Sequence, residues 1–181
     1  MRPPNILIAG LLLAVGLIAA GGWQPAAAAP EGEVRAANPE GELISLAEMS
    51  DDELRAAMVK FVENFYLAGE DQSDEQLTVL YAPVVDYFGS RRKSRVAIIR
   101  DQKSYYRKWP DRSFLLAPNT LRVERTSGGE PIVEVTFEYL FDNRSAKRRS
   151  RGRGVSYLTL DFSVAGGQII REGGRVLQRY R

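Results

Sequence analysis

A change in the spacing of apolar residues at Pro110 constrains the fold of this chain more than any other feature. Before Pro110, apolar residues recur at intervals of three and four, and after it they alternate with polar residues, which is the period of a β-strand. Residues 133–141 and 158–164 show this alternation most clearly. Helices that precede a run of strands predict an α+β domain, in which the helices cover one face of an antiparallel sheet.

Two capping boxes mark where the first two helices begin. In Ser50–Glu53 and Ser73–Gln76, a serine precedes a Glu or Gln by three residues, so each side chain can bond to the backbone of the other residue. The first helix is expected to end at Gly69, and the second is a short helix that Pro83 ends. A third helix is expected over residues 95–108. Its main apolar face is expected to hold Val96, Ile99 and Tyr106, flanked by Ile98 and Tyr105.

The remaining segments predict short strands and turns. Residues 84–88 are expected to form a strand, and the basic residues 90–93 a turn. The last strand contains Gly173–Gly174, which indicates either a bulge or a second tight turn. The other segments are expected strands at 113–117 and 121–123, and turns at 127–129 and 166–167.

The N-terminal residues predict a secretory signal peptide. A short start that carries Arg2 precedes an uncharged apolar run, 6–20, and small residues with an alanine cluster follow. Cleavage is expected after the signal peptide 1–28, which leaves 29–49 as a flexible linker and 50–181 as the folded domain. The protein is therefore expected in the periplasm or secreted. The alternative is an uncleaved apolar run that anchors it in the inner membrane.

The chain contains no Cys and no His, and this limits its chemistry. Disulfides, zinc–thiolate sites and cysteine nucleophiles are excluded, and a histidine-dependent catalytic triad cannot form. Any proton transfer must use Asp, Glu, Tyr, Lys or Ser. We expect no metal site and no cofactor.

Local sequence carries a resemblance to a known family. The segment Tyr81–Gly89, the helix expected after it and Trp109–Ser113 resemble a bacterial exported subset of the nuclear transport factor 2-like superfamily. That superfamily includes ketosteroid isomerase, scytalone dehydratase, limonene epoxide hydrolase and the SnoaL-like polyketide cyclases. The resemblance covers about 50–181. It implies a curved antiparallel sheet that wraps a long N-terminal helix into a cone with a pocket at its open end, but no particular activity.

Enzymes of this superfamily usually rely on His, Asp or Tyr in the cone, so without His an Asp/Tyr arrangement is what remains. Asp86 lies in an expected strand, where it could act as a general base or form a structural ion pair at the strand edge. The tyrosines could orient a polar ligand or pack in the core, and Trp109 and Arg112 could bind a ligand or close the cone. The expected pocket residues are Tyr66, Asp86, Tyr105, Tyr106, Trp109, Arg112 and Tyr139, with Asp86 as the catalytic candidate.

A basic segment joins the two longest expected strands. Its basic residues are Arg144, Lys147, Arg148, Arg149, Arg151 and Arg153. The segment could bind an anionic lipid or a cell-wall polymer, or form a solvated hairpin tip. A nucleic-acid partner is not expected because the loop lacks aromatic residues for base stacking.

These observations lead to three hypotheses about function. The first is an exported, non-catalytic domain whose cone binds a small ligand or an envelope protein. The second is a small-molecule isomerase, dehydratase or cyclase that uses Asp86 and a tyrosine, and the third is an electrostatic adaptor that uses the basic segment. A homodimer through the outer sheet face is common in the superfamily, although Glu134, Thr136 and Glu138 make that face polar on one strand.

Overall fold

The computed structural model describes residues 35–37, 43–45, 48–68, 73–126, 131–164 and 166–181. In chain order the elements are β1 (Arg35–Ala37), β2 (Leu43–Ser45), α1 (Asp51–Phe61), the π-helical turn η1 (Val62–Tyr66), α2 (Asp74–Leu80), β3 (Tyr81–Tyr87), β4 (Ser90–Ser94), α3 (Arg95–Lys108), β5 (Asp111–Leu116), β6 (Arg122–Arg125), β7 (Ile132–Ser145), β8 (Arg148–Asp161) and β9 (Gln168–Tyr180). No helix among the described residues is long and apolar enough to cross a membrane.

Parts of the prediction fall outside the described residues: the signal peptide 1–28, Gly69 and the turn at 127–129. Within the segment expected as a linker, β1 and β2 pair antiparallel, with Ala36 opposite Ile44.

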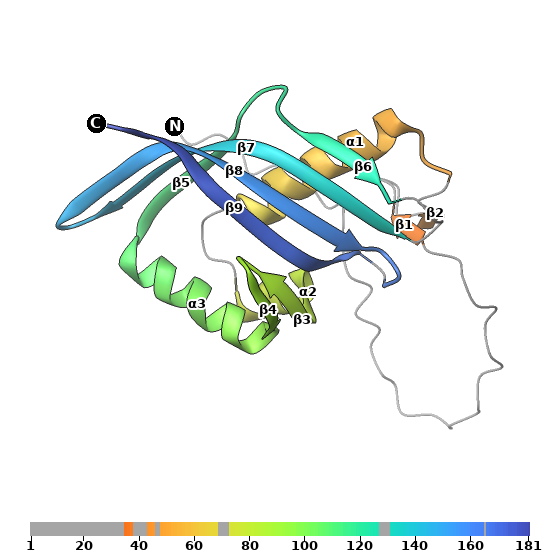
Figure 1. Ribbon diagram of the computed structural model, residues 1–181, viewed down its shortest axis with the longest axis horizontal. Coiled ribbons are helices and arrows are strands. Elements are labelled where there is room, and N and C mark those ends of the chain that lie inside the picture. Colours follow the sequence, from red (N-terminus) through yellow and green to blue (C-terminus); the bar gives the residue numbers. More distant parts are fainter. Residues whose placement is uncertain (1–34, 38–42, 46–47, 69–72, 127–130, 165) are drawn as a thin grey trace, which may run out of the picture.

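One curved, unclosed sheet of seven strands forms the body of the domain (Figure 1). Its order is β4-β3-β9-β8-β7-β5, and β6 pairs with β7 beyond the end of β5. All neighbouring strands are antiparallel except β3 and β9, which are parallel. The long strands β7, β8 and β9 lie side by side, and α1 lies along one face of them (Figure 1). This is the α+β architecture that the change of period predicts.

The core lies between α1 and the concave face of the sheet. Buried apolar side chains come from α1, from the first residue of η1 and from the long strands. They are Leu54, Met58, Phe61, Val62, Val133, Val135, Phe137, Leu158, Leu160 and Ile169. These residues follow the helical and the strand periods predicted from the sequence, because the helix contributes one face and each strand contributes alternate residues.

Both predicted capping boxes are confirmed. The Ser50 amide donates to Glu53 Oε2 at 2.8 Å, and the Ser73 amide donates to Gln76 Oε1 at 3.0 Å. The first helix does not stay α-helical to its end: it widens into η1, where the Leu67 amide donates to the Val62 carbonyl at 2.7 Å. Single π turns of this kind are frequent at functional sites, and Tyr66 ends this one.

Three local predictions were wrong. The basic residues expected as a turn form the strand β4, and the turn lies before it at Phe88–Gly89, where both residues have positive φ angles. The strand expected at 84–88 begins earlier, at Tyr81, because Pro83 is tolerated within β3. In α3, Ile99 and Tyr106 of the predicted face do lie on the inner side, but Val96 is 77% exposed and the fully buried residue is Ile98.

The last strand runs straight through Gly173–Gly174 without a turn. Its register with β8 shifts elsewhere, at Ile170 and Leu177, which are the extra residues of two β-bulges. Gly174 is needed for a close approach, because a Cβ there would lie 2.6 Å from the Val155 carbonyl oxygen. Gly173 has open space around its Cα.

Gly174→Ala is therefore expected to destabilise the domain by about 1–3 kcal/mol, since the neighbouring backbone must move. Gly173→Ala is its matched control and is expected to change stability by no more than about 0.5 kcal/mol. Urea unfolding of both variants measures this difference. Equal effects of the two substitutions would contradict the close approach of β9 to β8.

Candidate functional site

A cavity of about 250 Å³ lies between η1, α2, α3 and the concave face of the sheet. Six of the eight tyrosines of the chain line it, so we call it the tyrosine-lined cavity. These are Tyr66, Tyr81, Tyr87, Tyr105, Tyr106 and Tyr139. Phe114 and Glu172 also contribute to its wall. The cavity thus combines aromatic rings, polar hydroxyls and one deeply buried carboxylate.

Glu172 is the buried carboxylate of this cavity; the second acidic residue of the lining, Asp101, is 45% exposed and pairs with Lys93. Glu172 lies in β9, opposite Leu158 of β8, and only 3% of its surface is exposed. Tyr66 donates a hydrogen bond to its Oε1 at 2.8 Å, and Tyr81 donates to its Oε2 at 2.6 Å. The Tyr66 hydroxyl also lies 3.0 Å from Ser156 Oγ. No Lys or Arg among the described residues forms an ion pair with Glu172.

Burial controls the protonation of this group. It raises the pKa of Glu172 from its ordinary value of 4.5 to about 7, and the hydrogen bonds from Tyr81 and Tyr66 oppose this rise. Near neutral pH the carboxyl group can therefore both accept and return a proton. Burial raises the pKa values of Tyr66 and Tyr81 well above 10, and the charge of Glu172 raises them further. Both phenols consequently remain donors.

The other cavity tyrosines also keep their protons. Burial raises the pKa of Tyr105 to about 12, and it raises the pKa values of Tyr87, Tyr106 and Tyr139 as well. Asn143 Nδ2 donates to the Tyr105 hydroxyl at 2.8 Å, and Gln102 Nε2 donates to the Tyr87 hydroxyl at 3.2 Å. The hydroxyls that line the cavity can thus donate hydrogen bonds to a polar ligand.

A glycine on the sheet makes room for one of these rings. A Cβ at Gly154 of β8 would lie 2.6 Å from Cζ of Tyr139, which is its direct partner on β7. The Tyr139 ring therefore packs across the backbone of β8, and the size of the cavity depends on a position that is not in its lining.

The structure brings together four of the seven residues predicted for the pocket: Tyr66, Tyr105, Tyr106 and Tyr139. Asp86 lies elsewhere. It borders a shallow groove with Val84, Val85, Arg91 and Arg92, its carboxylate lies 3.5 Å from Arg171, and its side chain is 38% exposed. This is the strand-edge ion pair that was the alternative interpretation, so Asp86 is not the carboxylate that faces the tyrosines.

Trp109 and Arg112 are buried beside the cavity without lining it. The Arg112 guanidinium stacks on the ring of Tyr106, 3.9 Å from its centroid. The indole of Trp109 has two cations over it, Lys108 at 5.8 Å and Arg148 at 5.5 Å.

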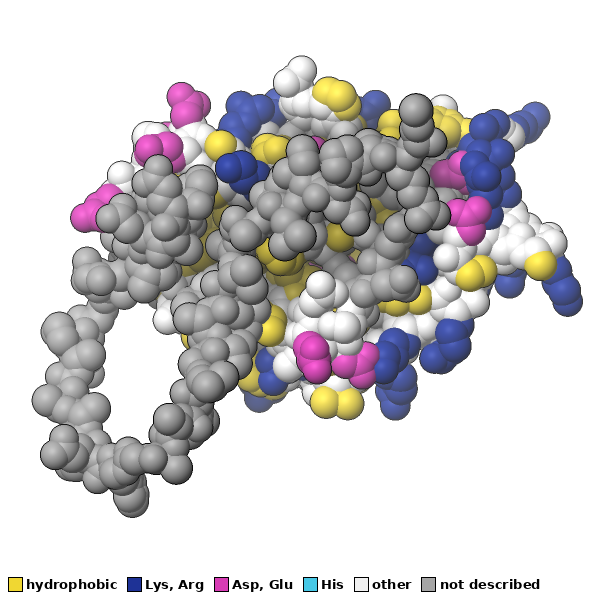
Figure 2. Space-filling view, turned by 180° about the vertical axis from the view of Figure 1, so that it is seen from behind, with side chains coloured by type: hydrophobic (Ala, Val, Ile, Leu, Met, Phe, Trp, Pro, Cys, Tyr) yellow, Lys and Arg dark blue, Asp and Glu magenta, His cyan; other side chains and the backbone are white. Residues whose placement is uncertain are grey.

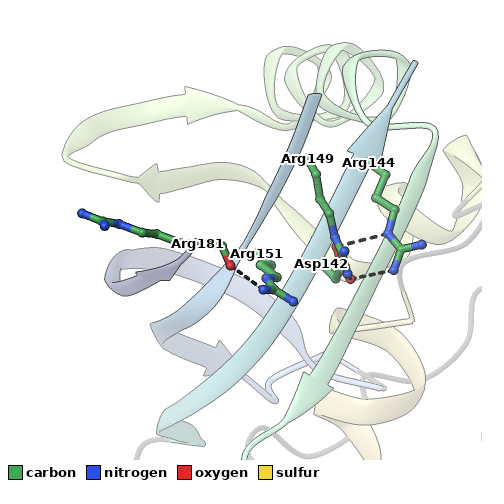
Figure 3. Close-up of polar contacts among 5 residues, drawn as sticks. All are labelled: Asp142, Arg144, Arg149, Arg151 and Arg181. Carbon is green, nitrogen blue, oxygen red and sulfur yellow. Dashed lines mark hydrogen bonds and ion pairs between the residues drawn. The ribbon is translucent and has the colours of Figure 1, made fainter. Parts of the chain in front are cut away.

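The basic segment forms the tip and flanks of the β7–β8 hairpin. Dark-blue Lys and Arg side chains gather at that end of the molecule in Figure 2, with acidic side chains among them. Arg144 and Arg149 both bind Asp142, and Arg151 donates to the carbonyl oxygen of Arg181 (Figure 3). Arg153 pairs with Glu138. Four of the six predicted bases thus make hydrogen bonds or ion pairs within the domain and Arg148 lies over Trp109, which lowers the charge available for an anionic partner.

Sequence reasoning missed Glu172, and the bulge at Ile170 explains why. Ile169 and Glu172 are three positions apart, yet both are buried on the concave face. Strict alternation places them on opposite faces, but the extra residue in β9 reverses the alternation between them. The signal in the sequence is weak: an acidic residue two positions after the apolar pair Ile169–Ile170.

No model of a known protein family matches this sequence, and no curated protein matches it. Solved structures do match. Bd1075 of Bdellovibrio bacteriovorus is 18% identical with a TM-score of 0.55; the match covers 76% of this chain and 46% of that one, so the chain spans less than half of that relative. A protein with a cystatin-like fold from Caulobacter vibrioides is 12% identical with a TM-score of 0.55, covering 69% of this chain and 91% of that one.

A third similar structure is a hexachlorocyclohexane dehydrochlorinase from Novosphingobium barchaimii LL02. It is 11% identical with a TM-score of 0.55, and the match covers 70% of this chain and 88% of that one. Identities this low show the fold alone. Together with the curved sheet around α1 and the cavity in its concave face, they confirm the expected architecture: the chain has the nuclear transport factor 2-like, cystatin-like fold.

Proposed function

We propose that the domain binds a small organic molecule in the tyrosine-lined cavity and that Glu172 transfers a proton on it. One observation carries this proposal: a carboxylate with a pKa of about 7 lies in the cavity wall, held by two phenols that remain protonated. A group with a pKa near the working pH is best suited to both halves of a proton transfer.

The reaction class follows from the groups present. Glu172 removes a proton from a carbon next to a carbonyl group, the C–H bond breaks, and its electron pair moves into an enolate. A cavity phenol donates a hydrogen bond to the enolate oxygen, which stabilises the developing charge. Glu172 then returns the proton to a different carbon, which isomerises the substrate, or a leaving group departs from the β-carbon with the electron pair, which completes an elimination.

The comparison with known structures agrees with this class of reaction. One structure of similar fold is a dehydrochlorinase. The likeness is limited to the fold, so the proposal depends on the residues of this chain, and above all on Glu172.

Exchange of carbon-bound protons tests the proposal without knowledge of the substrate. In D₂O, the protein is expected to accelerate deuterium incorporation into the α-positions of cyclohexanone or 2-tetralone, as followed by ¹H NMR. The rate is expected to rise with pH around a midpoint of about 7, because the ionised form of Glu172 is the base. Glu172→Gln is expected to lower the rate by a factor of about 100 or more.

Asp86→Asn is the matched control, since it removes a carboxylate outside the cavity, and it should leave the rate unchanged. Exchange that survives in Glu172→Gln would refute the proton-transfer proposal. Binding of these ketones without exchange would instead support the non-catalytic binding function.

We also propose that the domain works outside the cytoplasm. The apolar run at 6–20 and the small residues after it support export. Mass spectrometry of the protein from periplasmic, membrane and cytoplasmic fractions would test this. Cleavage after residue 28 leaves a chain that begins at Ala29, and recovery from the cytoplasmic fraction alone would contradict export.

A further inference from the structure

Arg112 is a buried cation without an acidic partner. Only 8% of its surface is exposed, and no carboxylate among the described residues forms an ion pair with it. Its Nη1 donates to the Trp109 carbonyl oxygen at 3.3 Å, and its buried Nε has no hydrogen-bond partner. A buried charge is costly unless it is paired and hydrogen-bonded, so an unpaired guanidinium indicates a place for an anion.

Asn143 faces Arg112 from the next strand. The two residues are direct partners in the β5–β7 ladder, and both are buried. Asn143 Nδ2 donates to the Tyr105 hydroxyl, and its buried Oδ1 has no partner. Because the hydroxyl can donate or accept, the amide can also turn so that Nδ2 points towards a bound oxyanion while Oδ1 accepts from Tyr105. Two neighbouring side chains thus have unused hydrogen-bonding capacity.

These two residues adjoin the tyrosine-lined cavity. The ring on which Arg112 stacks, Tyr106, and the hydroxyl that Asn143 contacts, Tyr105, both belong to the cavity wall. Phe114, two residues after Arg112 on β5, also lines the cavity. The positive charge of Arg112 lowers the pKa values of Tyr105 and Tyr106 against the effect of burial, so its field reaches the lining hydroxyls.

We propose that Arg112 and Asn143 bind the carboxylate of an organic acid whose ring or chain occupies the tyrosine-lined cavity. This inference rests on the proposed function, because it names the substrate class of that same cavity. One guanidinium matches one negative charge, which favours a carboxylate over a doubly charged phosphate. Arg112 offers the planar fork of donors that suits a carboxylate. The ligand's body then extends among the aromatic rings of the wall that also contains Glu172.

Benzoate and benzamide form a matched pair of probes, since they differ in charge but hardly in shape. Isothermal titration calorimetry at pH 7 is expected to show that benzoate binds at least about tenfold more tightly than benzamide. Arg112→Gln is expected to remove this preference. Arg148→Gln, which removes an exposed arginine beside Trp109, should keep it. Equal affinities for the two probes, a preference that survives in Arg112→Gln, or one that Arg148→Gln abolishes would overturn the site.

A measurement on the unaltered protein covers the case in which Arg112→Gln fails to fold. The Nε–H resonance of Arg112, identified by its absence in Arg112→Lys, is expected to shift when benzoate is added but not when benzamide is added. No shift with benzoate would overturn the proposal.

The two proposals fail separately. Glu172→Gln should lower the rate of proton exchange by a factor of about 100 or more and keep the preference for benzoate. A protein that prefers benzoate through Arg112 but exchanges no ketone protons would refute the proton transfer and leave this site standing, and the reverse result would overturn this site alone.

Discussion

Glu172→Gln is expected to abolish the loss of stability that the folded domain undergoes between pH 5 and pH 8. Burial raises the pKa of Glu172 from 4.5 to about 7, so between these values the folded state holds a proton that the unfolded state has released. Stability is therefore fully present below pH 4.5 and falls as the pH rises through 7. The loss amounts to about 3 kcal/mol, or roughly 10 °C in melting temperature.

Few other groups of this chain change their protonation between pH 5 and pH 8. The chain has no His, the group that ordinarily titrates in this range. Arg149 and Arg144 hold the pKa of Asp142 well below its usual range, and burial holds the cavity phenols well above theirs. Denaturant unfolding from pH 5 to pH 8 should thus report mainly on Glu172. A slope that persists in Glu172→Gln would show that another group causes it.

Replacing both Tyr66 and Tyr81 with Phe is expected to extend the loss of stability to higher pH. The two phenols donate to the carboxylate, and a hydrogen bond to a charged group contributes about 1.5–3 kcal/mol. Without them the pKa of Glu172 should rise by about 2 further units. Stability in the double variant is then expected to fall until about pH 9, whereas the stability of the unaltered protein levels off near pH 7.

Tyr87→Phe controls for the loss of a cavity hydroxyl, because Tyr87 bonds to Gln102 and not to Glu172. Its stability should level off at the same pH as in the unaltered protein. The same pH profile in the double variant and in the unaltered protein would mean that the phenols do not stabilise the ionised carboxylate.

Most of the fold could be predicted because it depends on local signals. Ser50 and Ser73 define two helix starts by their own hydrogen bonds, and the alternation over 133–141 places β7 and its buried face. The predictions that were wrong depend on long-range contacts. The segment 90–94 becomes a strand because it pairs with β3, and β3 itself pairs parallel to β9, at the other end of the chain.

The site was only half predictable for the same reason. Four of the six cavity tyrosines could be identified from the sequence, but Tyr81 and Tyr87 were missed, because both belong to β3, which pairs with the distant strand β9. Strand register places Asp86 outside the cavity and Glu172 inside it: Asp86 lies opposite Arg171 in the β3–β9 pair, and the next residue of β9 turns inward after the bulge. A shift of one residue in strand register decides which carboxylate is buried. Neither the helical period nor the strand period of the sequence predicts such a shift.

The contact between Gly154 and Tyr139 means that the ligand range of the cavity can change through a residue that no ligand touches. A side chain at 154 would push the phenol of its partner towards the interior, leaving less room for a substrate while every group in the wall keeps its identity. Related chains with the same aromatic wall can therefore accept molecules of different bulk according to the presence of a methyl group on the neighbouring strand. For the ligand binding proposed above, the backbone of β8 then contributes to selectivity together with the tyrosines.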